Sequence, residues 1–160
     1  MIMRYVLMLI LFFISNYAHS QTTYIKTNCY EGYIFPKEHA IWGIPPENNR
    51  YTLNAYEIIQ AEKILADSIN SNRLVQKQVQ WNECPINKKT LKKYIRQYIG
   101  YKNERGEIVI SINLYKNKKI SKEMYMEDII FISDGEFNYW SLLINISTKQ
   151  LSDMRINGVG

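Results

Sequence analysis

The second half of the chain alternates apolar and polar residues with a period of two, and no other feature constrains the fold as strongly. Over residues 107–115, one set of alternate positions is entirely apolar: Ile108, Ile110, Ile112 and Leu114. Over residues 137–147, the matching set is Trp140, Leu142, Ile144 and Ile146. Successive side chains of a strand point to opposite faces. Both segments therefore predict strands with one face in a core.

Further strands are predicted on either side of these two. Tyr94–Lys102 and Glu107–Tyr115 flank the loop Asn103–Gly106, which ends in glycine and is typical of a hairpin. Residues 128–133 predict another strand that ends at Asp134-Gly135, and residues 151–157 predict a last one after a turn at 148–150.

A helical period precedes the strands. Apolar residues recur at steps of three and four between positions 54 and 72: Ile58, Ala61, Ile64, Leu65 and Ile69. Asn54 or Thr52 is suited to cap this helix, and Glu57 follows Asn54 by three residues, as a capping box requires. We expect a helix over residues 54–72 that frays toward residue 80.

The order of these elements predicts an α+β fold, in which one amphipathic helix packs on a curled antiparallel sheet of four to five strands. Cystatin-like and NTF2-like folds have a similar element order, an analogy that gives no function. Residues 51–160 hold the helix and sheet, and residues 21–50 are a poorly defined part of the same domain. Within the latter, Tyr24–Phe35 allows a strand, and the prolines that follow indicate a loop.

The first 20 residues have the composition of a secretory signal peptide. Arg4 provides a positive charge, residues 5–14 are uninterruptedly apolar, and Ala18-His19-Ser20 provides a small-x-small cleavage site. The apolar run is shorter than the roughly 20 residues that span a bilayer. We therefore expect cleavage before Gln21 and a periplasmic or extracellular protein that does not span the membrane. An uncleaved membrane anchor is the alternative.

The two cysteines, Cys29 and Cys84, both follow the cleavage site. Outside the cytoplasm, such a pair is more often bridged than free. A disulfide would close a loop of about 55 residues and stabilise the domain by about 2–4 kcal/mol. Two separate buried thiols are the alternative.

Several runs are similar to a group of small exported bacterial proteins without an established activity. The runs are Lys93–Glu107, Tyr51-Thr52 with Ala61-Glu62-Lys63, Asp134-Gly135, Tyr139-Trp140, Asn145–Thr148 and Asn157-Gly158. The similarity covers roughly residues 50–160. It supports the architecture and the exported location, and it provides no catalytic residue to transfer.

No catalytic, metal or cofactor motif stands out. His39 is the one histidine after the cleavage site, and no nucleophile has a diagnostic context near it. Acidic residues gather at Glu123, Glu127, Asp128, Asp134 and Glu136. Such a cluster can serve glycoside hydrolysis or bind calcium, but it more commonly solvates a strand end. We expect no cofactor and no metal.

The charge is uneven: residues 88–122 hold eleven Lys or Arg against two Glu. Tyr94, Arg96 and Tyr98 would project from one strand face, and such an aromatic-basic stripe suits an interface with a protein or an anionic surface. An exported protein rarely meets nucleic acid, so we expect none as a partner. The alternatives are that the lysines only solvate loops and edges and that the stripe packs under the helix.

These observations lead to three hypotheses. The first is an exported, non-enzymatic binding protein, for example of the inhibitor or immunity type. The second is a small-ligand carrier or an enzyme that uses the concave face of an NTF2-like sheet. The third is a structural protein of the cell envelope.

Overall fold

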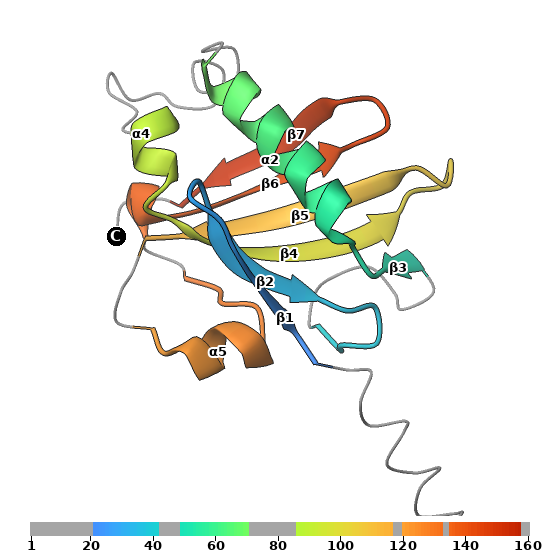
Figure 1. Cartoon of the computed structure of the whole chain (residues 1–160), viewed down its shortest axis with the longest axis horizontal. Coiled ribbons are helices and arrows are strands. Elements are labelled where there is room, and N and C mark those ends of the chain that lie inside the picture. The colour runs from blue at the N-terminus through green and yellow to red at the C-terminus, as the bar shows by residue number, and fades with distance from the viewer. Residues whose placement is uncertain (1–20, 42–48, 71–85, 117–119, 133–134, 158–160) are drawn as a thin grey trace, which may run out of the picture.

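The computed structural model describes residues 21–41, 49–70, 86–116, 120–132 and 135–157, which form an α+β fold (Figure 1). The strands are β1 (Thr23–Lys26), β2 (Glu31–Phe35), β3 (Arg50–Tyr51), β4 (Ile95–Lys102), β5 (Ile108–Tyr115), β6 (Tyr139–Asn145) and β7 (Gln150–Ile156). The helices are α2 (Ala55–Asn70), α4 (Lys88–Leu91), α5 (Lys122–Glu127) and the 3-10 turn η2 (Glu136–Asn138). In the described part of the chain, no helix is long and apolar enough to cross a membrane.

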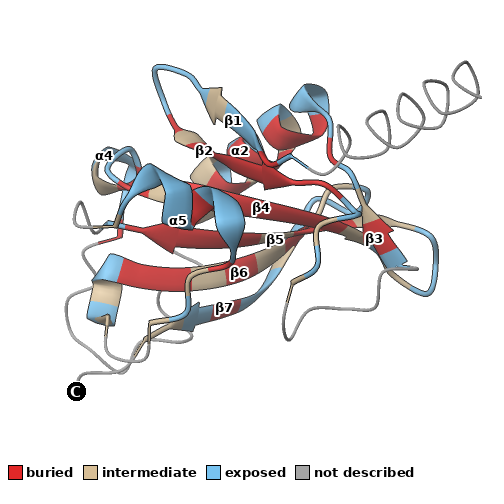
Figure 2. Ribbon diagram, turned by 90° about the horizontal axis from the view of Figure 1, so that it is seen from below, coloured by how far each residue is buried: buried red, intermediate tan, exposed pale blue. Residues whose placement is uncertain are grey.

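All seven strands belong to one curled, open sheet. Six follow the order β1-β2-β4-β5-β6-β7, and β3 pairs with the C-terminal end of β4. β2 runs parallel to β4, whereas the other pairs are antiparallel. Helix α2 crosses one face of this sheet, and α5 lies on the other side (Figures 1 and 2).

The sheet has seven strands where the sequence predicts four to five, because the N-terminal segment contributes three. The predicted strand within residues 24–35 is a hairpin of two strands, β1 and β2. Its turn is held by the Thr27 hydroxyl, which accepts hydrogen bonds from the backbone N–H groups of Cys29 and Tyr30, each at 3.1 Å.

The predicted helix and the β4–β5 hairpin are confirmed. Asn54 Oδ1 accepts from Glu57 N at 3.0 Å, and Glu57 Oε2 accepts from Asn54 N at 2.8 Å, so the capping box forms in both directions. In the hairpin loop, Asn103 Oδ1 accepts from two backbone N–H groups, and Gly106 adopts a φ of 73°. The predicted extension of the helix beyond residue 72 lies outside the described residues.

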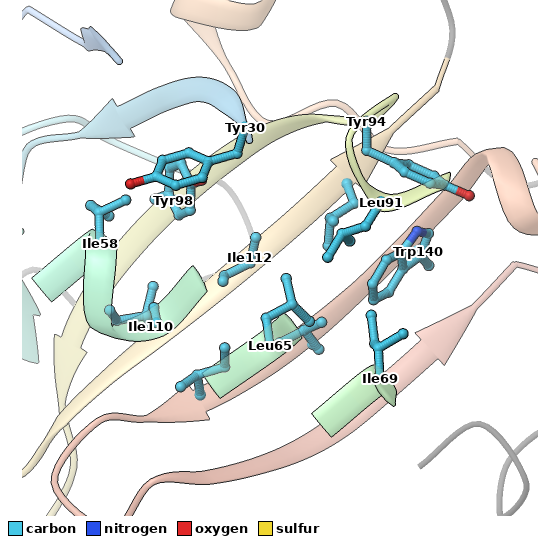
Figure 3. Packing of buried hydrophobic residues seen from close by; sticks show 14 of the residues in the cluster. Tyr30, Ile58, Leu65, Ile69, Leu91, Tyr94, Tyr98, Ile110, Ile112 and Trp140 are labelled. Carbon is cyan, nitrogen blue, oxygen red and sulfur yellow. The ribbon is translucent and has the colours of Figure 1, made fainter. Parts of the chain in front are cut away.

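The main core lies between α2 and the sheet (Figure 3). The apolar faces predicted from the alternation are buried except near their ends: Ile108 and Ile146 are partly buried. The others are at most 1% exposed: Ile110, Ile112, Leu114, Trp140, Leu142 and Ile144. From the helix, Ile58, Ala61, Leu65 and Ile69 pack onto them. The apolar strand faces predicted from the period of two thus pack against the apolar helix face predicted from the period of three to four.

The opposite face of the sheet carries a second, smaller core. On this side, the strand predicted at 128–133 does not form within the described residues. Residues 128–132 run as irregular chain after α5, and Ser133 lies outside the described residues. The reason is Gln97, fully buried in β4, whose Nε2 donates to the carbonyls of Tyr125 and Asp128 at 2.9 and 2.8 Å. Its Oε1 accepts from Ile130 N at 3.2 Å. These backbone groups bond to one side chain instead of a neighbouring strand, and β6 occupies the place beside β5.

Candidate functional site

A pocket of about 220 Å³ opens beside α2, between that helix, the β1–β2 turn and α4. Its apolar lining comes from Tyr30, Ile59, Ala66 and Leu91. Its charged lining comes from Glu62, Lys63, Lys88, Lys92 and Arg96, and Cys29 completes it. We call this the lysine pocket.

Two of the charged residues form a buried ion pair between α2 and β4. Arg96 is fully buried, and its Nε and Nη2 donate to the two carboxylate oxygens of Glu62 at 3.1 and 3.2 Å. The hydroxyl of Tyr98 donates to Glu62 Oε1 at 2.8 Å, and the Arg96 guanidinium lies 5.8 Å from the centre of the Tyr30 ring. Both charges are therefore neutralised where they are desolvated, which a buried charge requires.

The tyrosines around this pair remain protonated. Burial raises the pKa of Tyr98 well above its usual value; the Glu62 charge adds to this effect, and Arg96 opposes it. Burial and the Glu62 charge also raise the pKa of Tyr30. Neither hydroxyl is thus disposed to serve as a proton acceptor at neutral pH.

The lysines of the pocket have a different environment. Lys63, Lys88 and Lys92 are exposed, and within the described part of the chain no acidic side chain forms an ion pair with them. Lys63 lies on α2, whereas Lys88 begins α4 and Lys92 directly follows it. Helix α4 is fixed by a capping box between Asn87 and Thr90 and by the burial of Leu91. The positive charge therefore faces solvent from an anchored position.

The predicted aromatic-basic stripe lies in the interior and forms no exposed surface. Arg96 and Tyr98 share one face of β4, and Tyr94 directly precedes the strand. Helices α2 and α4 cover this side, and Tyr94, Arg96 and Tyr98 are 2%, 0% and 0% exposed. The Tyr94 ring packs edge-on against Trp140 at 5.7 Å, and its hydroxyl donates to the carbonyl of Phe137. The alternative in which the stripe packs under the helix is thus the one found. Among the three residues, only Arg96 lines the lysine pocket.

Glu62 is a residue of the site that is not predicted from the sequence. It falls between Ile58 and Leu65 on the apolar stripe of α2, where an acidic residue is out of place unless a cation lies opposite. An acidic residue on the buried stripe of α2 indicates a buried cation opposite it, and that cation is Arg96 on β4.

Cys29 lies exposed in the β1–β2 turn, at the edge of the lysine pocket. Cys84 lies outside the described residues, so the disulfide stays a prediction. Along the chain, Cys84 precedes Lys88, another lining residue, by four positions.

His39 and Asp128, two other candidate residues from the sequence, make contacts within the fold. His39 Nε2 lies 2.7 Å from the carbonyl oxygen of Glu127, and its ring packs edge-on against Phe35. In the predicted acidic cluster, Asp128 accepts from the backbone N–H of Ile129 at 2.7 Å, and Asp134 lies outside the described residues. No three His, Cys, Asp or Glu residues gather as metal ligands in the described ranges.

A second hollow, of about 540 Å³, lies between α2 and the β6–β7 turn. Ile59 and Lys63 line both hollows, and Tyr56 joins them at the second. Tyr56 and Ile59 are 68% and 55% exposed. The outer side of α2 is thus a ridge with apolar side chains and a hollow on each flank, and we call it the α2 ridge.

Comparison with protein-family models, with curated proteins and with solved structures found no match to this chain. The surfaces of the domain itself therefore carry the functional inference.

Proposed function

We propose that this chain is an exported, non-enzymatic binding protein that recognises a protein partner through the α2 ridge. The observation that carries the proposal is the exposure of Tyr56 and Ile59 on a regular helix between two hollows. Contiguous exposed apolar side chains mark interaction sites, and the residues that dominate an interface cluster near its centre in well-packed pockets.

The chemistry of the lysine pocket supports binding more than catalysis. Its carboxylate, Glu62, is held by Arg96 and by Tyr98, so its oxygens already have donors. A general base must lie within hydrogen-bond reach of a substrate proton, whereas the side chain of Glu62 is only 8% exposed. The lysines at the mouth are exposed and suited to hold an anionic group.

Export rests on the signal peptide predicted at residues 1–20. Thr22 is buried, and its hydroxyl donates to the carbonyl of Met126 at 2.7 Å, so the domain includes the chain from the second residue after the predicted cleavage site. Intact-mass measurement of the protein from the envelope and the medium tests the cleavage. A product that begins at Met1 would contradict it.

Site-specific photocrosslinking tests the binding surface. A benzophenone amino acid is placed at Ile59 or at Met124, which are equally exposed at 55% but lie on α2 and α5, on opposite sides of the sheet. We expect a discrete covalent adduct in the producing cell for Ile59 and none for Met124. The adduct should disappear when Tyr56 is changed to Asp. Equal labelling from both positions, or none from Ile59, would refute the proposal.

The small-ligand carrier is the second candidate, because the lysine pocket combines apolar walls with ionisable groups. Under this alternative, a small molecule that copurifies with the protein should be found by mass spectrometry of a denatured sample. The structural envelope role predicts neither a ligand nor a discrete adduct.

A further inference from the structure

We infer that the lysine pocket receives one apolar side chain from an acidic segment of the protein partner. The inference rests on the proposed binding function and adds the chemistry of the partner. It follows from the size of the pocket, from its apolar lining and from the charge at its mouth.

The size favours a single side chain. At about 220 Å³, the pocket is smaller than the roughly 300–1,000 Å³ of sites that enclose drug-sized ligands or cofactors. Ile59, Ala66, Leu91 and the Tyr30 ring line it with carbon, which suits a Leu or Phe side chain. A few anchor side chains that fill well-packed pockets dominate the energetics of many protein interfaces.

The charge specifies the flanks of that anchor. Lys63, Lys88 and Lys92 line the pocket with exposed side chains, and among the described residues its one acid, Glu62, is neutralised by Arg96. The described lining residues therefore leave the positive charge of these lysines uncompensated. Carboxylates next to the anchor would complement it, which raises the association rate and disfavours basic partners.

The test uses the folded protein and short synthetic peptides followed by NMR titration. The first peptide has one central Phe flanked by Glu and Ser; in two controls, Phe is replaced by Ala, or each Glu by Lys. We expect the first peptide to shift resonances of α4 and of Ile59 and Ala66. Each control should bind about tenfold more weakly or not at all, and added salt should weaken binding.

Variants of α4 give a matched control within the protein. Lys88→Glu with Lys92→Glu should weaken the acidic peptide about tenfold. Lys89→Glu with Lys93→Glu makes the same charge change outside the pocket lining and should have a clearly smaller effect. Ala66→Phe, which fills the pocket without changing charge, should also abolish binding. Unchanged thermal unfolding would show that each variant is folded.

Several outcomes would overturn the inference: equal affinity for the basic peptide, shifts that map elsewhere, or the same loss from both double variants. Tighter binding of decanoate than of the peptide would assign the pocket to a small amphiphile. Tighter binding of single-stranded DNA would assign the lysines to phosphates. An Ile59 crosslink without acidic-peptide binding would leave the proposed function standing and refute only this inference.

Discussion

Removing either partner of the Glu62–Arg96 pair should destabilise the domain severely, whereas removing both should not. Arg96→Met leaves a carboxylate that is 8% exposed with Tyr98 as its remaining side-chain donor. Glu62→Leu leaves a fully buried guanidinium with the carbonyl of Tyr94. Breaking a buried pair in this way costs about 3–5 kcal/mol. That is a large share of the roughly 5–15 kcal/mol by which a domain is stable.

The double variant has no unpaired charge. A hydrophobic pair of similar volume is often neutral relative to a buried ion pair, and the Tyr98 hydroxyl that loses its acceptor costs about 1–3 kcal/mol. We therefore expect the double variant to be more stable than either single one, with a coupling energy above about 3 kcal/mol.

Urea unfolding at neutral pH measures all four free energies of the cycle. The exposed pair Lys37–Glu38, 3.8 Å apart, is the control, and Glu38→Gln should change stability by less than about 0.5 kcal/mol. Single variants that lose less than about 1 kcal/mol, or losses that add, would show that Glu62 and Arg96 are not a buried, coupled pair.

Burial raises the pKa of Tyr98 and of Tyr115, so both hydroxyls stay protonated in the folded state. Tyrosines of the unfolded chain ionise near pH 10. Above pH 10, the free energy of unfolding should therefore fall by about 1.4 kcal/mol per pH unit for each of these hydroxyls. Urea titrations across this range should show a smaller slope for Tyr98→Phe, and a flat profile in the unmodified protein would contradict the burial. Non-reducing peptide mapping should find Cys29 and Cys84 in one linked fragment, and reduction should lower the unfolding free energy by about 2–4 kcal/mol; alkylation of both thiols in native, unreduced protein would exclude the bridge. Gly32→Ala should destabilise the domain by about 2 kcal/mol or more in a denaturant melt, because its Cβ would lie 2.5 Å from a backbone oxygen of β4; a loss below about 0.5 kcal/mol would refute this close packing.

The parts of the fold that the sequence predicts well are those with local signals. Helix α2 has both a period and a capping box, and β4 and β5 are joined by a loop with its own hydrogen bonds. The pairing of β2 with β4 has no local signal, since the two strands are far apart in sequence. The segment 128–133 resembles a strand in isolation, but backbone groups of this region bond to the side chain of Gln97 on β4, two strands away from β6.

The site shows the same limit. That Arg96 and Tyr98 share a face follows from the strand period, and this is found. The period of β4 does not specify which of its faces α2 covers. That choice depends on the ion pair between Glu62 and Arg96, which are 34 positions apart in the sequence. The pocket itself assembles from the β1–β2 turn, α2, α4 and β4, so no continuous motif encodes it.

The parallel pairing of β2 with β4 also sets an order of events in folding. β4 and β5 can pair across a short loop. The pairing of β2 with β4 requires the closure of a loop of roughly 60 residues and is therefore expected later. A chain that emerges N-terminus first thus presents β1 and β2 before their neighbour in the sheet exists. A bond between Cys29, just ahead of β2, and Cys84, eleven positions ahead of β4, would close nearly the same loop in advance. We therefore expect the oxidised chain to refold faster than the reduced one.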